Sequence, residues 1–485
     1  MLKLNKLIVV NVLVLGLIGA VGLPGSASAA SGSSEPFVTW NRTSLDPNSS
    51  YALKDLAKSS STGLTTWGAT GACAVKGTQL TTAKAGICQV VLTVKGDKTY
   101  SASKTSYGLT VCPTKMKNGK PSGKSVQIGL LQPTTGASAQ SAKNVVALIE
   151  METKRVNKAG GVNCGELKVK AYDTALIPAT AALETQRAIS DGAKALIGPW
   201  STSEALASGQ VAEGAGVVQI NMSAATNSIT EDKEFIFRTS PLTTDLGKAM
   251  VDVAIAMKAS TIGILHDSGG FGLGAKPVVE AAAKKLGVKF TTVQYTISAT
   301  SVSSEVQAIV NTKPDMVVIL GSTGADYGLI AKALAEQNTL KPLVGFSPIV
   351  LPDAINISGG AYDKLPGIYT LQAADSTKPL YKNILDRFNA ANPKNKLTNL
   401  PEQMLGAYDA FHYLVEGLIQ SKGAGGKPLV TSLVNLPGSA RANGKSGAIH
   451  QFALGKHDSL SGQKYLNLYK LVNGTVVQDT SIVLK

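Results

Sequence analysis

Two short loops rich in hydroxyl groups are the strongest candidates for a binding site in this sequence. The first follows the apolar run 195–197 and carries Ser201 and Thr202. The second follows another apolar run and carries Ala224 and Thr226. Hydroxyls and free main-chain N–H groups at the start of a helix attract negative charge. The two loops therefore predict a site for an anionic group such as a carboxylate.

The same hydroxyls also fit a simpler role as helix caps. Ser and Thr are common N-cap residues, and an Ala-rich helical pattern runs from Ser203 to about Glu213. Two such loops at the ends of successive strands favour a ligand site, because open α/β sheets bind ligands at the carboxyl ends of their strands. Trp200, beside the first loop, fits either a pocket wall or packing between helices. Both interpretations remain open from the sequence.

Patterns that would indicate nucleotide binding or catalysis are incomplete. The glycine-rich run 269–274 departs from G-x-G-x-x-G, and Thr296 stands where a ribose-binding acid would follow the next strand. The Gly-Lys-Ser tripeptides at 123–125 and 444–446 lack the first glycine of a P-loop. No Gly-x-Ser-x-Gly nucleophile motif occurs. We expect a protein that is not an enzyme and needs no cofactor.

Four cysteines remain after the N-terminal region, and four cysteines allow three connectivities. Cys73 and Cys88 lie in one small segment rich in β-pattern, which favours a bond between them. Cys112 and Cys164 precede two strands expected to be parallel, so they lie at the same edge of the sheet and a bond between them is geometrically sensible. There is no Cys-x-x-Cys, and the four histidines show no ligand spacing, so we expect no metal site.

The chain has a formal net charge of +15 over 485 residues. Its lysines are scattered, and no cluster of basic and aromatic residues indicates nucleic-acid binding. A dispersed basic surface facing an anionic cell envelope is the simpler explanation. The length predicts two or three domains.

The N-terminal residues 1–29 have the pattern of a secretory signal peptide. Lys3 and Lys6 precede the apolar stretch 7–23, and Ala27-Ser28-Ala29 fits a cleavage site. The stretch is shorter than the roughly 20 residues of a membrane span. No cysteine lies near this site, so we expect an exported protein, periplasmic or in the cell envelope, that is not lipid-anchored there.

Residues 30–112 are expected to form an all-β module, because short alternating runs are separated by Gly, Asn and Asp turns. A basic, polar linker follows at 113–125. From residue 126 apolar strands alternate with helices, which predicts α/β architecture with parallel sheets. We expect strands at 126–131, 167–172, 195–197, 217–220, 261–266, 288–295, 316–320, 343–346, 465–471 and 475–478. We expect helices at 139–158, 178–191, 203–213, 243–258, 272–286, 302–311, 325–337, 350–357, 379–391 and 402–421.

An ordered set of short motifs in this region resembles the leucine/isoleucine/valine-binding proteins, the extracytoplasmic receptors of branched-chain amino acid ABC importers. The motifs are Val126-Gln-Ile-Gly-Leu-Leu, Ala159-Gly-Gly-Val, Tyr172-Asp173, Leu196-Ile-Gly-Pro, Ala225-Thr226 and Phe237-Arg-Thr-Ser-Pro241. The resemblance implies a type I periplasmic-binding-protein fold over 126–485, with two Rossmann-like lobes joined by three crossings. Lobe one would comprise 126–238 and 371–448, and lobe two 239–370 and 449–485. The β module in turn resembles bacterial immunoglobulin-like repeats.

The resemblance also implies a set of ligand-binding positions. The carboxylate-binding loops of the family match Ser201 and Thr202 in the first loop and Ala224 and Thr226 in the second. Four other positions depart from the family, because hydroxyl or aromatic residues replace its Tyr or Glu: Phe271, Thr323, Ser347 and Ser141.

The position of Ser347 matters most, because amino-acid binders carry there the Glu that pairs with the ligand's ammonium group. Asp267 and Asp326 are nearby acids that fit either that role or a cap in a loop. An unpaired buried ammonium is unfavourable. We therefore expect a carboxylate or amide ligand other than a common branched-chain amino acid.

The expected function is capture of a small organic solute between two lobes, by a monomer that delivers it to an ABC permease. The alternative is a ligand-binding sensor that is not coupled to transport.

Overall fold

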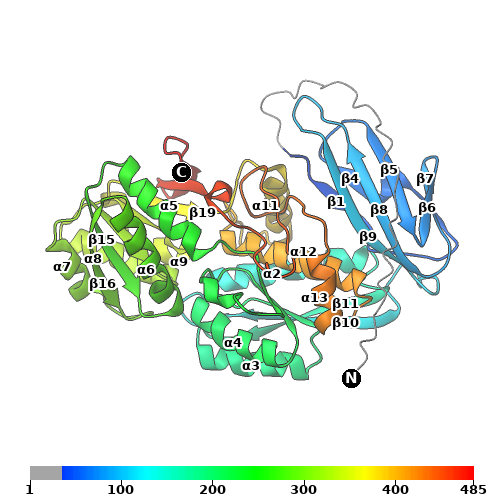
Figure 1. Ribbon diagram of the computed structural model, residues 1–485, viewed down its shortest axis with the longest axis horizontal. Coiled ribbons are helices and arrows are strands. Elements are labelled where there is room, and N and C mark those ends of the chain that lie inside the picture. The colour runs from blue at the N-terminus through cyan, green and yellow to red at the C-terminus, as the bar shows by residue number, and fades with distance from the viewer. Residues whose placement is uncertain (1–34, 485) are drawn as a thin grey trace, which may run out of the picture.

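The computed structural model describes residues 35–484, which form a β segment and two α/β lobes (Figure 1). The β segment contains β1 (Val38–Trp40), β2 (Ser44–Leu45), β3 (Ser50–Ala52), α1 (Leu53–Leu56), β4 (Ala57–Ser59), β5 (Thr65–Gly71), β6 (Cys73–Lys76), β7 (Gln79–Thr82), β8 (Gly86–Val94) and β9 (Ser103–Val111). Lobe one contains β10 (Gly123–Gln132), α2 (Ala139–Lys158), β11 (Gly165–Asp173), α3 (Pro178–Ser190), β12 (Ala195–Ile197), α4 (Thr202–Gly214), β13 (Val218–Asn221), η1 (Asn227–Ile229), β14 (Ile236–Arg238), α11 (Pro379–Ala391), α12 (Glu402–Gln420) and α13 (Gly426–Val434).

Lobe two contains α5 (Thr243–Ala256), β15 (Thr261–Asp267), α6 (Gly270–Lys285), β16 (Lys289–Tyr295), α7 (Ser303–Val310), β17 (Met316–Leu320), α8 (Gly324–Glu336), β18 (Leu343–Phe346), η2 (Ser347–Val350), α9 (Pro352–Ser358), α10 (Ala361–Lys364), β19 (Ile368–Gln372), η3 (Gln463–Tyr465), β20 (Asn467–Val472) and β21 (Thr475–Gln478). The predicted alternation of strands and helices is confirmed. The strands β14 and β19, the α-helices α10 and α13, and the short 3-10 helices η1, η2 and η3 were not predicted.

Each lobe is built on its own sheet. The lobe-one sheet has the strand order β11-β10-β12-β13-β14, with all neighbours parallel. The lobe-two sheet has the order β16-β15-β17-β18-β19-β20-β21, and only its last two pairs are antiparallel. Central strands such as β17 are buried along their whole length, as continuous apolar runs in parallel sheets are expected to be. The predicted fold class, α/β with parallel sheets, is confirmed.

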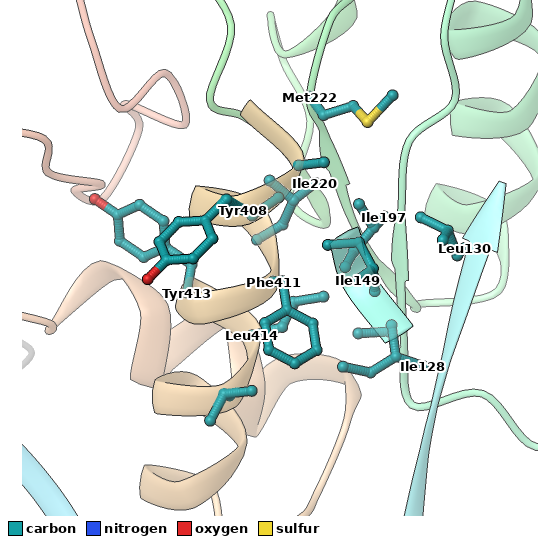
Figure 2. Close-up of a cluster of buried hydrophobic side chains, with 14 of the residues drawn as sticks. Ile128, Leu130, Ile149, Ile197, Ile220, Met222, Tyr408, Phe411, Tyr413 and Leu414 are labelled. Carbon is teal, nitrogen blue, oxygen red and sulfur yellow. The ribbon is translucent and has the colours of Figure 1, made fainter. Parts of the chain in front are cut away.

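The core of lobe one joins segments that are far apart in the sequence. Helix α12 packs Phe411 and Leu414 against Ile128 of β10 and Ile220 of β13 (Figure 2). This helix is buried almost all round, so it lacks the polar stripe of a surface helix. Its C-terminal end also meets the β segment, where Gln420 Nε2 donates to Gln89 Oε1 at 2.9 Å.

The chain crosses between the lobes three times. The first crossing follows β14, which ends at Arg238, and the second follows β19, which ends at Gln372. The third lies in the stretch 442–460, where Ala442 and Phe452 belong to the lobe-one core and Ala448 and Leu460 pack in a lobe-two core cluster. The Phe452 ring packs on Phe237, with centroids 4.9 Å apart, so the chain still contacts the lobe-one core at residue 452.

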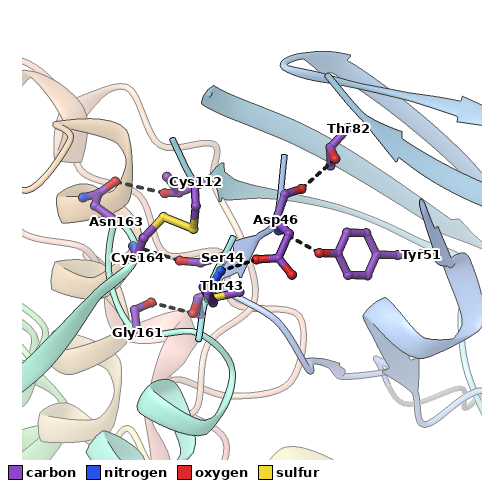
Figure 3. The surroundings of a disulfide bond; sticks show 11 residues. Thr43, Ser44, Asp46, Tyr51, Thr82, Cys112, Gly161, Asn163 and Cys164 are labelled. Atoms are coloured by element: carbon purple, nitrogen blue, oxygen red, sulfur yellow. Dashed lines mark hydrogen bonds between the residues drawn. A yellow bond between two sulfur atoms is a disulfide. The ribbon is translucent and has the colours of Figure 1, made fainter. Parts of the chain in front are cut away.

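The β segment is fastened to lobe one at β2 and the loop after α2 (Figure 3). Thr43 Oγ1 donates to Gly161 O at 2.5 Å, and Cys164 N donates to Ser44 Oγ at 3.1 Å. The disulfide between Cys112 and Cys164 lies beside these contacts. The attachment therefore combines a covalent bond with several hydrogen bonds.

Both predicted disulfides are present. The second joins Cys73 of β6 to Cys88 of β8, and so connects two sheets of the β segment. The segment 113–122 between the β segment and β10 is mostly exposed, and β10 begins at Gly123, inside the expected linker. The predicted signal peptide, 1–29, lies outside the described residues. From residue 35 to 484, no helix is long and apolar enough to cross a membrane.

Candidate functional site

The two lobes meet at a small cavity at the carboxyl ends of their central strands. Its volume is about 20 Å³, which is room for about one water molecule. Its wall combines residues of both lobes: Trp200, Ser201, Thr202, Ser223, Ala224, Ala225, Phe271, Gly321, Ser322, Phe346 and Pro348. The cleft between the lobes is thus closed, and residues in or beside the predicted loops contact Gly270 of lobe two across it.

The first hydroxyl loop begins at a backbone position that only glycine fits. Gly198 has φ of 101°, and a Cβ there would lie 2.4 Å from Leu131 O. Ser201 then caps α4: its Oγ accepts from Glu204 N at 3.3 Å and donates to Glu204 Oε2 at 2.7 Å. The capping role considered for Ser201 is therefore present, although Ser201 also lies on the cavity wall.

The hydroxyl of Thr202 faces the second loop, and its neighbours Thr226 and Ser203 contact lobe two. Thr226 Oγ1 lies 3.5 Å from Thr202 Oγ1 and donates to Gly270 O at 3.2 Å. Ser203 Oγ accepts from Gly270 N at 2.8 Å. These hydroxyls of lobe one therefore contact the start of α6 in lobe two, as closure of the cleft requires.

The second loop is held in place from behind by buried polar groups. Ser240 Oγ donates to Ala224 O at 2.7 Å. Arg238, which is fully buried, donates through Nη1 to Thr226 O at 2.7 Å and pairs with Asp458 at 2.7 Å. The position of Thr226 thus depends on an ion pair formed at the third crossing between the lobes.

Lobe two contributes an apolar wall. Phe271 lies near the start of α6 and Phe346 ends β18, and their rings are 5.5 Å apart between centroids. Both are almost fully buried. Trp200 of lobe one faces the same cavity, which favours its interpretation as a pocket wall.

Neither acid considered as a partner for an ammonium group lies on the cavity wall. Asp267 accepts three main-chain hydrogen bonds, from Gly269, Gly272 and Ser322, and so fixes the loops of lobe two. Burial raises the pKa of Asp267. Burial, with a smaller contribution from Asp267, raises the pKa of Asp326 to about 7. Both carboxyls therefore lie outside the lining of the cavity.

Four predicted ligand residues also lie off the wall: Thr226, whose contacts are given above, Thr323, Ser347 and Ser141. Thr323 is fully buried, and its Oγ1 caps α8 by accepting from Asp326 N at 3.2 Å. Ser347 Oγ accepts from Gln403 Nε2 at 2.8 Å. Ser141 Oγ donates to Asp353 Oδ2 at 2.9 Å. The last two bonds join lobe one to lobe two, so Ser141 and Ser347 are closure contacts in this conformation.

Sequence reasoning missed the lobe-spanning partners Gln403 and Asp353 and the wall residues Ser322 and Phe346. The sequence could have indicated Ser322 and Phe346, because Ser322 follows a predicted strand and Phe346 ends another. Both strands end at the same sheet edge as Phe271. Nothing in the local sequence marks Gln403 or Asp353, since their partners lie 56 and 212 residues away.

The cavity wall is electrically neutral in its side chains. None of the residues of the described chain that line it is charged. Hydroxyls and main-chain N–H groups at the start of α4 can still bind a carboxylate. An ammonium group would find no carboxylate on this wall.

Comparison with known protein families and sequences identifies proteins similar to this chain. A family model described as periplasmic binding protein matches residues 125–458. A leucine-, isoleucine-, valine-, threonine- and alanine-binding protein of Pseudomonas aeruginosa is 26% identical over 269 residues, which cover 55% of this chain and 72% of the relative. A Leu/Ile/Val-binding protein homologue of Brucella melitensis is 26% identical over 300 residues, covering 60% and 78%.

Solved structures share the fold at low identity. A leucine-binding protein of Thermotoga maritima aligns with a TM-score of 0.65 and 18% identity, covering 73% of this chain and 98% of its own. A solute-binding protein of Rhodopseudomonas palustris in complex with 3,4-dihydroxybenzoic acid aligns with a TM-score of 0.63 and 20% identity, covering 73% and 96%. A branched-chain amino acid transporter substrate-binding protein of Streptococcus pneumoniae, in complex with isoleucine, aligns with a TM-score of 0.62 and 18% identity. The alignment covers 73% of this chain and 100% of that protein.

Proposed function

The chain belongs to the periplasmic binding protein family, and from this membership we propose that it captures a small organic solute outside the cell membrane and delivers it to the permease of an ABC importer. The cleft between its lobes is the ligand site, and Thr202 and Thr226 contact the solute. The observation that carries the proposal is the meeting of two hydroxyl-rich helix starts with an apolar wall from the other lobe. The protein acts as a monomer and is exported without its signal peptide.

The ligand is a carboxylate or amide whose far end is apolar or neutral. Thr202, Thr226 and the main chain at Ala224 supply hydrogen bonds for the carboxylate end. Phe271 and Phe346 supply an apolar surface for the far end. The relatives bound to isoleucine and to 3,4-dihydroxybenzoic acid represent the two choices, and the uncharged wall favours the second kind.

Ligand binding works through closure of the two lobes. The contacts from Thr226 and Ser203 to Gly270 form only when the lobes meet. A solute between the lobes would take over part of these bonds and hold the same closed arrangement. We also propose that residues 37–111 are an immunoglobulin-like module carried by the binding protein.

A thermal-shift screen tests the ligand class. Aliphatic and aromatic monocarboxylates, benzoate and 4-hydroxybenzoate among them, should raise Tm by several degrees at saturation, since a ligand that binds only the native state stabilises it. Leucine and valine should leave Tm unchanged. Stabilisation by leucine at micromolar concentration, with the carboxylates inert, would overturn the ligand class but leave the binding function intact.

Removing one cleft hydroxyl should weaken binding. Thr202→Ala should lower affinity for the carboxylate found in the screen by about 1.5–3 kcal/mol, because a hydrogen bond to a charged group is lost. Calorimetry measures the loss, and Thr312→Ala, on the outer face of lobe two, is the matched control. Equal affinities in a folded Thr202→Ala protein would assign that hydroxyl to closure alone.

A further inference from the structure

A cavity much larger than the one in the cleft lies between the β segment and lobe one. Its volume is about 370 Å³, within the roughly 300–1,000 Å³ typical of small-molecule sites. Strands β1 and β9 form one wall, and α2, α11, α12 and the stretch 438–442 form the other. The β segment and its neighbour lobe therefore enclose a space that neither would enclose alone.

Several polar groups on this wall have no hydrogen-bond partner among the described residues. They are the Ser103 hydroxyl, Arg441 Nε and Glu35 Oε2. Tyr107 and Tyr408 line the same cavity. Both tyrosines are only 9% exposed. Buried polar groups are nearly always hydrogen-bonded, so a set of unpaired ones around one cavity indicates that something polar occupies it.

The wall of this cavity is rich in hydroxyl groups. Beyond the two tyrosines, six serines and threonines line it: Thr39, Thr43, Ser103, Thr105, Ser106 and Ser439. A hydroxyl both donates and accepts, which suits a ligand that itself carries several hydroxyls. The stacked rings of Trp40 and Tyr107, with centroids 5.0 Å apart, supply a flat surface beside them.

The charges around the cavity leave one positive charge in excess. Five cationic residues line it: Lys104, Arg155, Lys378, Arg387 and Arg441. The anions are Glu35, Asp409 and Glu416 on the wall and Glu152 behind it. Glu152 alone accepts from both Arg155 and Arg387.

Ionisation of the buried groups keeps this balance at neutral pH. Burial by itself raises the pKa of Glu152. The hydrogen bond from His412 and the charges of Arg155 and Arg387 outweigh burial and hold this pKa below its usual range. Burial lowers the pKa of His412, so that ring is neutral. Burial raises the pKa of Asp409 to about 6, which leaves this carboxyl mostly ionised at pH 7.

We propose that this cavity is a second ligand site, which takes a small polyhydroxylated monocarboxylate of the hexuronate kind. The carboxylate faces the excess positive charge of Arg155 and Arg387. The ligand's hydroxyls pair with those of Tyr107 and Tyr408. The site is independent of the cleft and of the solute that the cleft binds.

An NMR saturation-transfer titration of the full chain with sodium galacturonate tests the proposal. Wild type should bind it, and neutral galactose should bind at least tenfold more weakly because it lacks the carboxylate. Binding should weaken as NaCl is raised. The double variant Tyr107→Phe/Tyr408→Phe should raise Kd about tenfold, because two hydrogen bonds are lost while both rings remain.

The cleft variant Thr202→Ala separates the two sites, and it should leave galacturonate binding unchanged. Circular dichroism and Tm show that each variant is folded. Loss of binding in Thr202→Ala, with the tyrosine variant unaffected, would place galacturonate in the cleft and overturn the proposal. So would no binding by wild type, or equal binding of galactose and galacturonate.

Discussion

Replacing Glu402 by glutamine should stabilise the protein at alkaline pH and leave its stability at pH 5 nearly unchanged. Glu402 begins α12 at the second crossing between the lobes, where its Oε2 accepts from Ala373 N at 3.2 Å. Its Oε1 is buried without a partner among the described residues. Burial raises the pKa of Glu402 from 4.5 to about 8. The native state therefore holds this carboxyl in its neutral form at neutral pH.

The sign of the effect follows from that pKa. A raised pKa means that the folded protein binds the proton more tightly than the unfolded chain does. The contribution of this carboxyl to the free energy of unfolding is complete below about pH 4.5. It is lost as pH rises from there through 8, and the total loss is on the order of 4–5 kcal/mol at most. Glutamine is neutral at every pH, so the variant avoids this decline.

Urea unfolding at pH 5 and at pH 9 measures the effect. The difference in unfolding free energy between variant and wild type should be near zero at pH 5 and should favour Glu402→Gln by several kcal/mol at pH 9. Glu150→Gln, an exposed change on α2, is the control and should shift neither value. A Glu402→Gln protein that follows the wild-type pH profile would show that this carboxyl is ionised in the fold.

Replacing Asp458 by asparagine should destabilise the protein by about 3 kcal/mol. The change leaves the guanidinium of Arg238, which is fully buried, without its counter-ion, and removing one partner of a buried pair typically costs about 3–5 kcal/mol. We expect the lower end because Asp458 is 22% exposed. Unfolding in urea measures this loss.

The same substitution should also weaken ligand binding, since Arg238 holds Thr226 O at the edge of the cleft. Glu336→Gln removes the carboxylate of an exposed pair with Lys332 and should change stability by less than about 0.5 kcal/mol. If Asp458→Asn were as mild as this control, the ion pair would have no structural role at the third crossing.

The lobes could be predicted from the sequence because their strands are continuous apolar runs and their helices have clear periodicity. The expected helices 139–158 and 379–391 match α2 and α11 to the residue. Strand β14 was missed because it has only three residues and ends in the charged Arg238. An arginine in a buried strand is recognisable only when its partner is known, and Asp458 lies 220 residues away.

The candidate site was predictable in part for the same reason. Residues that directly follow strands, such as Thr202 and Ala224, must lie at one sheet edge, and the structure brings them together. Ser347 and Ser141 contact Gln403 and Asp353 instead of lining the cavity, because the relative position of the lobes decides which side chains meet. That position depends on three crossings whose geometry no local pattern encodes.

The disulfide between Cys112 and Cys164 spans the exposed, lysine-bearing segment 113–122. A protease that nicks this segment would break the main chain but would not shed the β segment, because the covalent bridge still joins the two fragments. The nicked protein would migrate as one species on a non-reducing gel and as two after reduction. In an exported protein, the β segment would therefore stay attached after cleavage as long as the disulfide remains oxidised.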